Sequence, residues 1–130
     1  MSELVALSRE AILQADDIEI RKVEIPEWGG YVYVRGMTGK ERDDYEASLV
    51  KQRGRDTQVN MRNARAKLVV LCAVDEQGNK LFSESDIAKI SRKSAKAIDR
   101  IFAVARELSG ITEDDMEELT ENFDETDTDD

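Results

Sequence analysis

The sequence contains no histidine, a single cysteine and a single proline in 130 residues. The commonest general base of enzymes is therefore missing, which excludes the ordinary hydrolase triads. The lone Cys72 excludes an intramolecular disulfide and a cysteine-based zinc site, and it fits a reducing cytosol. These absences argue against an enzyme, a zinc protein and a disulfide-bonded secreted protein.

Long hydrophobic runs are also missing. No apolar segment approaches the roughly 20 residues that span a bilayer. The N-terminus lacks the basic stretch followed by an apolar run that a secretory signal requires. We therefore expect a protein that is neither exported nor embedded in a membrane.

Basic residues are missing from the C-terminal end. The formal net charge is -10, and residues 113–130 contain eleven acidic residues and no Lys or Arg. Subtracting these eleven from the total of 29 acids leaves 18 acids against 19 bases, so residues 1–112 are nearly neutral. Because nucleic-acid binders need clustered Lys and Arg, we expect no nucleic-acid partner. The acidic tail is a solvated repulsive segment, an electrostatic lure for a basic partner, or a brake on self-association.

Aromatic residues make up only 5% of the chain, so a core must be built mainly from aliphatic side chains, which suits packed helices. The length predicts one globular domain over residues 1–112, of the α+β, mainly α class, followed by a flexible acidic tail over 113–130. A β-hairpin is expected over about 17–35, because alternating apolar residues flank the turn-forming run Pro26–Gly30. The alternation slips once between Ile20 and Val23, which predicts a bulge.

Helical periodicity predicts a bundle of about four helices packed against this hairpin, over about 38–50, 58–74, 84–91 and 94–109. Thr38 and Glu41 have the spacing of a capping box, and Ser94 and Gly110 suit the two ends of the last helix. The second half of the second helix is apolar nearly all round, and this helix is expected to form the centre of the core. Residues 51–56 are expected to form a loop. A short helical turn should follow Ser8.

Motifs that could carry chemistry have simpler structural explanations. Ser91 with Lys93, or Ser94 with Lys96, could form a Ser-Lys pair, but capping serines beside surface lysines are much commoner. Gly39-Lys40 matches only the Gly-Lys pair of a phosphate-binding loop, without the earlier glycine in register or the Ser or Thr after the lysine. The segment from Asp75 to Asp86 has its glycine in the wrong place for a calcium loop. We expect no catalytic residue, no metal and no cofactor.

The order of several segments resembles the small tail assembly chaperones of siphophages and prophages. The resemblance covers roughly residues 8–123 and is carried by Val23–Gly30, Val32–Arg42, Val70–Cys72, Asp75–Phe82 and Lys93-Ser94. It implies a protein of the host bacterial cytoplasm that coats the helix-rich tape-measure protein and keeps it soluble until tail-tube subunits polymerise around it. It also implies absence from the finished virion, often a longer form made by translational frameshifting, and, in some members, homo-oligomers.

Five residues are candidates for binding a partner protein. Trp28 in the hairpin turn either caps the core or stands exposed as an interface anchor, and Tyr31 and Tyr33 follow it. Ile98 and Phe102 are expected on an exposed face of the last helix. The expected partners are the tape-measure protein and, as a second candidate, the tail-tube protein.

Two other functions are compatible with the sequence. The first is an inhibitor that mimics nucleic acid with its acidic tail and sequesters a basic DNA-binding protein. Deletion of residues 113–130 without loss of partner binding would contradict it. The second is a structural head-tail connector, which would be present in mature particles, whereas a chaperone would be absent from them.

Overall fold

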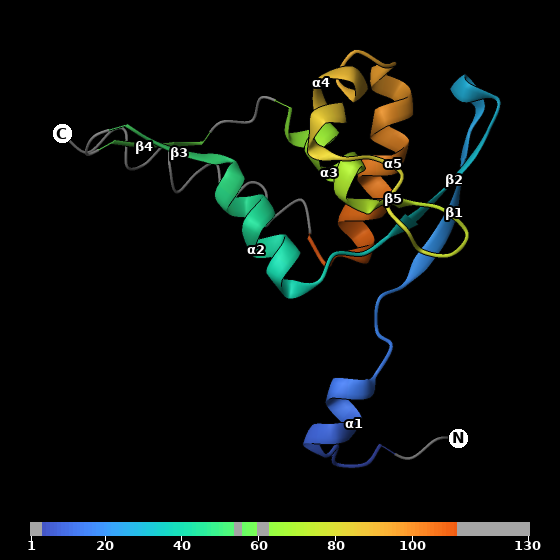
Figure 1. Ribbon diagram of the computed structural model, residues 1–130, viewed down its shortest axis with the longest axis vertical. Helices are drawn as coiled ribbons and strands as arrows, with labels where there is room; N and C mark the ends of the chain where they lie inside the picture. Colours follow the sequence, from blue (N-terminus) through green and yellow to red (C-terminus); the bar gives the residue numbers. More distant parts are fainter. Residues whose placement is uncertain (1–3, 54–55, 60–62, 112–130) are drawn as a thin grey trace.

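The computed structural model describes residues 4–53, 56–59 and 63–111. Most elements form one body, and the N-terminal helix α1 lies apart from it (Figure 1). In chain order the elements are α1 (Arg9–Gln14), β1 (Ile20–Ile25), the 3-10 helix η1 (Pro26–Trp28), β2 (Gly30–Arg35), α2 (Gly39–Ser48), β3 (Val50–Arg53), β4 (Asp56–Val59), α3 (Ala64–Cys72), β5 (Ala73–Val74), the 3-10 helix η2 (Glu84–Asp86), α4 (Ile87–Ile90) and α5 (Ala95–Leu108).

The predicted hairpin is present as strands β1 and β2. They pair antiparallel from Ile20 opposite Arg35 to Ile25 opposite Gly30, and β5 adds a third strand beside β2. The turn between them ends at Gly29, whose φ of 73° suits glycine. The predicted bulge was wrong, because the register continues without interruption from β1 to β2. Ile20 therefore points to the face opposite Val23 and is 46% exposed.

Helices α3 and α5 pack together, and α5 also packs on β1 and β2 (Figure 1). The core lies between these layers, because the apolar face of the hairpin needs a partner layer to bury it. The core residues that are fully buried include Ile25, Val34, Leu68, Val69 and Ile101. The prediction of α3 as the central core helix is confirmed in its apolar half.

Helix α3 starts at Ala64, so the prediction of a helix from residue 58 was wrong. Asn63 precedes it with φ of 62°, a left-handed conformation that cannot continue a right-handed helix. Residues expected to form a loop instead form β3, which pairs with β4 from Val50 opposite Val59 to Arg53 opposite Asp56. This second hairpin projects from the body beyond α2 (Figure 1).

The remaining helices match their predictions closely. Thr38 and Glu41 form the predicted capping box of α2. Ser94 caps α5, and Gly110 ends it with φ of 74°. The amide N–H of Ile111 bonds to the Arg106 carbonyl at 2.9 Å and that of Gly110 to the Glu107 carbonyl at 3.1 Å, the two bonds of a Schellman motif.

The fold class is thus confirmed as mixed helix and strand. The predicted two-stranded hairpin is part of a three-stranded antiparallel sheet, because residues 73–74, predicted to end a helix, form β5. The predicted acidic tail over 113–130 lies outside the described residues.

The sheet and α5 are joined closely at one point. A Cβ atom on Gly36 would lie 2.6 Å from the Leu108 carbonyl oxygen, so only glycine fits there without movement. Next to it, the amide N–H of Met37 donates to Ser109 Oγ at 2.9 Å. The end of β2 and the end of α5 are therefore held in direct backbone contact.

Candidate protein-interaction surfaces

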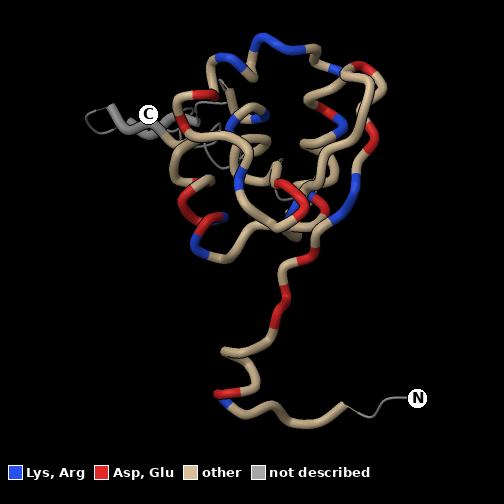
Figure 2. The backbone as a smooth tube through the Cα atoms, turned by 45° about the vertical axis from the view of Figure 1, so that its right-hand side comes forward, with Lys and Arg blue, Asp and Glu red and all other residues tan. Residues whose placement is uncertain are grey.

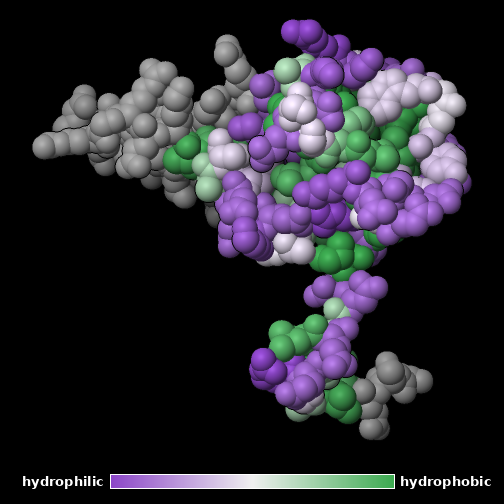
Figure 3. Space-filling model, in the orientation of Figure 1, coloured by the Kyte–Doolittle hydropathy of each residue, from purple (hydrophilic) through white to green (hydrophobic). Residues whose placement is uncertain are grey.

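Residues 4–14 form an arm with apolar side chains that nothing in the described chain covers. We call this segment the N-terminal arm; it comprises α1 and the residues before it, and α1 contains no buried residue. Figure 3 shows the hydrophobic surface of the arm standing clear of the body. The large apolar side chains are Leu4, Val5, Leu7, Ile12 and Leu13, which are 100%, 74%, 66%, 56% and 65% exposed. An isolated cluster of this kind is typical of a segment that binds a partner.

Hydrogen bonds between nearby residues shape the arm. Residues 15–19, which we call the acidic linker, separate it from the body. Ser8 Oγ accepts the Ala11 amide at 3.1 Å, and the extended Ala15 ends the helix. Acidic residues follow along the linker (Figure 2). The linker is fixed where the Gly36 amide donates to the Glu19 carbonyl at 3.0 Å. The helical turn after Ser8 was predicted from the sequence, but a binding role for this segment was not, although dense apolar residues ahead of an acidic stretch could have indicated one.

The hairpin aromatics form a second, separate surface. Tyr31 and Tyr33 lie on the sheet face opposite the core, with ring centroids 5.5 Å apart in an edge-on arrangement. The Lys22 ammonium lies 4.0 Å above the Tyr31 ring, a cation–π contact. Partial burial and the neighbouring Tyr31 raise the pKa of Tyr33. Trp28 at the turn is 38% exposed.

The hairpin turn is fastened to α5 by a two-bond ion pair. Arg100 Nε and Nη2 donate to the two carboxylate oxygens of Glu27 at 2.8 and 3.0 Å. This pair lowers the pKa of Glu27, because the hydrogen bonds stabilise its charged form. The turn that carries Trp28 is therefore held in place against α5.

A groove of about 500 Å³ forms a third surface, between the start of α3 and one side of α5. We call it the α3–α5 groove; its lining residues are Asn63, Ala64, Arg65, Ala66, Ser91, Lys93, Ala95, Ile98, Phe102 and Arg106. The expectation that Ile98 is exposed was wrong, because its side chain packs into the core and is 5% exposed. Phe102 is partly buried, and the Arg65 and Arg106 guanidinium carbons lie 5.9 and 5.4 Å from its ring centroid.

The structure does not bring the five predicted site residues together. Arg100 faces the hairpin turn, whereas Phe102, two residues later, is turned by about 200° round the helix. Trp28, Tyr31 and Tyr33 therefore belong to the hairpin, and Ile98 and Phe102 belong to the groove. Partner binding by any of the five stays a prediction.

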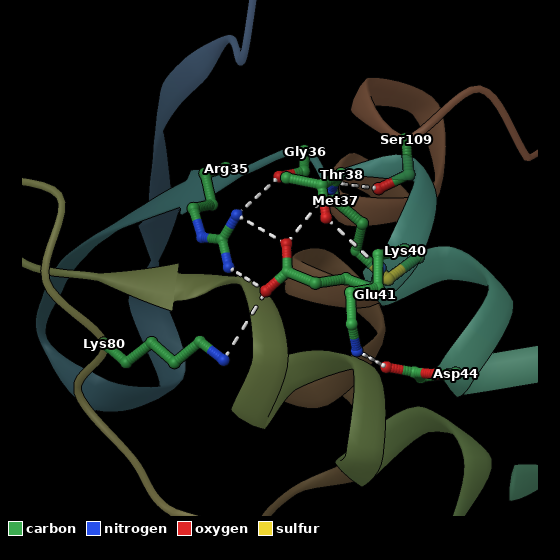
Figure 4. Close-up of polar contacts among 9 residues, drawn as sticks. All are labelled: Arg35, Gly36, Met37, Thr38, Lys40, Glu41, Asp44, Lys80 and Ser109. Carbon is green, nitrogen blue, oxygen red and sulfur yellow. Dashed lines mark hydrogen bonds and ion pairs between the residues drawn. The ribbon is translucent and has the colours of Figure 1, made fainter.

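A polar cluster joins β2, α2 and the loop after β5 (Figure 4). Arg35 donates to both carboxylate oxygens of Glu41, at 2.9 and 2.6 Å, and Lys80 Nζ lies 3.5 Å from one of them. The Thr38 amide donates to the same carboxylate at 3.0 Å. Arg35 is the main cause that lowers the pKa of Glu41 to about 2. A carboxylate held ionised by three donors connects elements and does not act as a general acid at neutral pH.

Cys72 is buried, and the two serines that lie beside lysines in the sequence serve helix ends. Burial raises the pKa of the Cys72 thiol to about 12, so the thiolate nucleophile is scarce. Ser94 Oγ accepts the Ala97 amide at 3.4 Å, and Ser91 Oγ donates to the Ala88 carbonyl at 2.7 Å, so both serines serve helix ends. Within the described residues, no group of three or more acidic or cysteine side chains is placed to hold a metal ion.

Comparison with known proteins gives one match. A family model described as phage tail assembly chaperone matches residues 7–125. No curated protein and no solved structure matches the chain. Among the described helices, none has the length and apolar character needed to cross a membrane.

Proposed function

The chain belongs to the phage tail assembly chaperone family, and from this premise we propose that it binds the tape-measure protein through the N-terminal arm. Family membership suggests a non-enzymatic role and implies protein partners in the tail. The observation that supports the tape-measure protein as partner is the set of five exposed apolar side chains on an arm that stands clear of the body.

The arm has physical reasons to bind an apolar, helical partner. A helix of six residues is too short to be stable alone in water, and no residue of α1 is buried by the part of the chain that the structure describes. Docking on an apolar stripe of a long helical protein would bury the five side chains, each worth about 1.5–3 kcal/mol if fully covered. That sum exceeds what the arm loses in conformational freedom only when most of the side chains are covered. The arm therefore suits a partner with an extended apolar surface.

The charges beside the arm suit the solubilising part of this role. Acidic residues line the linker (Figure 2), and the whole chain carries a net charge of -10. A partner coated with such chains gains negative charge, which opposes aggregation. We place this action in the host cytoplasm, with tail-tube subunits as a second partner that would displace the chaperone.

The test compares two matched double variants in co-expression with the tape-measure protein. Ile12→Ser with Leu13→Ser removes two arm side chains that are 56% and 65% exposed. Ile20→Ser with Leu81→Ser removes the same two residue types from the body, where they are 46% and 48% exposed. We expect the arm variant to lose co-purification with the tape-measure protein. The tape-measure protein should then be insoluble. The body variant should behave as wild type.

Two results would contradict the arm as the binding surface. Equal solubility of the tape-measure protein with the arm variant and with wild type would exclude a role of the arm in binding. Loss of binding in the body variant alone would move the interface to the outer sheet face near Tyr31. Light scattering of each variant alone reports whether the arm joins copies of the chaperone, and circular dichroism checks that each variant is folded.

A further inference from the structure

The α3–α5 groove has an apolar floor and a basic rim. Aliphatic and aromatic side chains form the floor: Ala64, Ala66, Ala95, Ile98 and Phe102. Arg65, Lys93 and Arg106 supply the rim, and among the described residues that line the groove none is acidic. Arg65 also pairs with Asp99 outside the groove at 3.3 Å, where both side chains are more than half exposed. The groove therefore suits a segment that carries apolar side chains flanked by negative charge.

The chain itself leaves the body at one end of this groove. Gly110 turns the chain back after α5, and Ile111 packs on the core with 4% exposure. The Ile111 amide bonds to the carbonyl of Arg106, which also lines the groove. The next residues therefore start beside the basic Arg106 end of the groove.

The residues that follow have the matching composition. Residues 113–130 contain eleven acids and no base. Met116, Leu119 and Phe123 are spaced i, i+3 and i+7, so in a helical conformation they would share one side, with acids between them. The opposite sign of charge on the rim and on this segment favours their contact.

The segment is also long enough. The groove follows α5 from Arg106 back to Ala95, eleven residues earlier, which is about 17 Å at 1.5 Å per residue. The 19 residues after Ile111 span about 28 Å even as a helix. A segment that runs antiparallel to α5 can therefore reach the far end of the groove with residues to spare.

We infer that residues 112–123 dock in the α3–α5 groove of the same chain, with Met116, Leu119 and Phe123 on its apolar floor and the intervening acids beside its basic rim. This docking gives the acidic segment an intramolecular role, since it covers the groove and adds negative charge beside the basic rim. The N-terminal arm and the hairpin aromatics then remain as exposed apolar surfaces among the described residues. These contacts lie within one chain and do not involve the tape-measure protein.

The experiment places a spin label on the acidic segment of the full-length chain. Asn122→Cys supplies a second thiol for labelling, while Cys72 is buried and its raised pKa keeps it unreactive in the folded protein. We expect the label to broaden the backbone amide signals of Ala64 and Ala95 at the groove and to leave those of Tyr31 on the outer sheet face sharp. Raising the salt from about 0.1 M to 1 M shortens the Debye length from about 10 Å to 3 Å and should weaken the broadening.

Matched rim variants test the charge contribution. Arg65→Glu with Lys93→Glu should remove the broadening, whereas Arg65→Lys with Lys93→Arg should keep it. Leu119→Ser with Phe123→Ser should remove it as well, because the apolar contacts are lost while every charge remains. Persistence of the broadening in both the charge-reversed and the apolar variants would overturn the inference, and so would equal broadening of Tyr31 and Ala95.

A mixed sample separates this docking from exchange between copies. Isotope-labelled chains without the spin label are mixed with unlabelled chains that carry it. Sharp groove signals in the mixture support docking within one chain. Broadened groove signals in the mixture would show that the acidic segment occupies the groove of a second copy, which would overturn the intramolecular inference.

Discussion

The body and the N-terminal arm use the same kinds of residue in opposite environments. In the body, Leu68 and Ile101 are fully buried between helices and sheet. In the arm, Leu13 and Ile12 remain 65% and 56% exposed. Apolar side chains that are buried explain why the body folds, whereas those that stay exposed contribute nothing to its folding. This difference supports the proposal that the arm residues contact a partner protein.

The two regions also differ in the sequence separation between the residues that their hydrogen bonds and ion pairs join. The body is fastened by pairs far apart in sequence, such as Arg21 Nη1 with Glu107 at 3.0 Å and Arg100 with Glu27. The arm is shaped by a bond over three residues, from the Ala11 amide to Ser8 Oγ. Long-range bonds tie the body into one cooperative unit, while the arm can move without breaking any of them.

The largest expected difference comes from one truncation made in each region. Leu68→Ala should lower the free energy of unfolding by about 2–5 kcal/mol, because it opens a cavity at a fully buried site. Leu13→Ala should change it by less than about 0.5 kcal/mol, because the side chain is exposed. Urea unfolding followed by circular dichroism measures both. A comparable loss in both variants would mean that the arm packs on the body in solution.

A smaller effect is expected where β2 meets α5. Gly36→Ala should destabilise the protein by about 1–3 kcal/mol, because the added methyl group meets the Leu108 carbonyl oxygen at 2.6 Å. Gly39→Ala is the matched control: nothing lies within 4 Å of its added methyl group, and the change should stabilise by about 0.4–1 kcal/mol. Thermal unfolding of both variants measures these changes. Unchanged stability of Gly36→Ala would show that β2 and α5 can move apart to accommodate the methyl group.

The smallest effect depends on pH. The folded-state pKa of Glu41 is about 2, below its ordinary 4.5, so its ion pair with Arg35 stabilises the protein above about pH 4.5. This contribution is lost as the pH falls from about 4.5 towards 2. Glu41→Gln should cost about 1–2 kcal/mol at neutral pH and flatten this acid-dependent loss.

Glu10→Gln supplies the arm control for this pH effect. Glu10 lies 3.5 Å from Arg9 with both side chains exposed, and such pairs contribute little to stability. Stability curves measured between pH 2 and 7 should therefore match the wild type. An unchanged curve for Glu41→Gln would contradict the stabilising role of the cluster in Figure 4.

Features set by neighbouring residues could be predicted from the sequence. The capping box of Thr38 and Glu41, the cap at Ser94 and the left-handed Gly110 all depend on bonds within a few residues. The hairpin turn around Gly29 belongs to the same class. These features could be predicted because the free backbone N–H and C=O groups at the helix ends bond to residues that are close in the sequence.

Features set by distant contacts could not be predicted in the same way. The strands β3 and β4 were missed because their residues are mostly charged or polar, which suggests a loop unless the partner strand is known. The bulge at Ile20 was wrongly predicted, because the side chain lies on the outer sheet face, near Gly78 of a later loop. The burial of Ile98 depends on α3, and the isolation of the arm depends on the absence of a covering layer among the described residues.

The joint between β2 and α5 also has a consequence for biosynthesis. Met37 and Ser109 meet across 72 residues, so the sheet can complete its packing only after nearly all of the body has left the ribosome. A two-stranded hairpin is at best marginally stable in water until then. The N-terminal arm needs none of these contacts and emerges before the body. During translation, the segment with the exposed apolar side chains is therefore available to a nascent partner before the body behind it has folded.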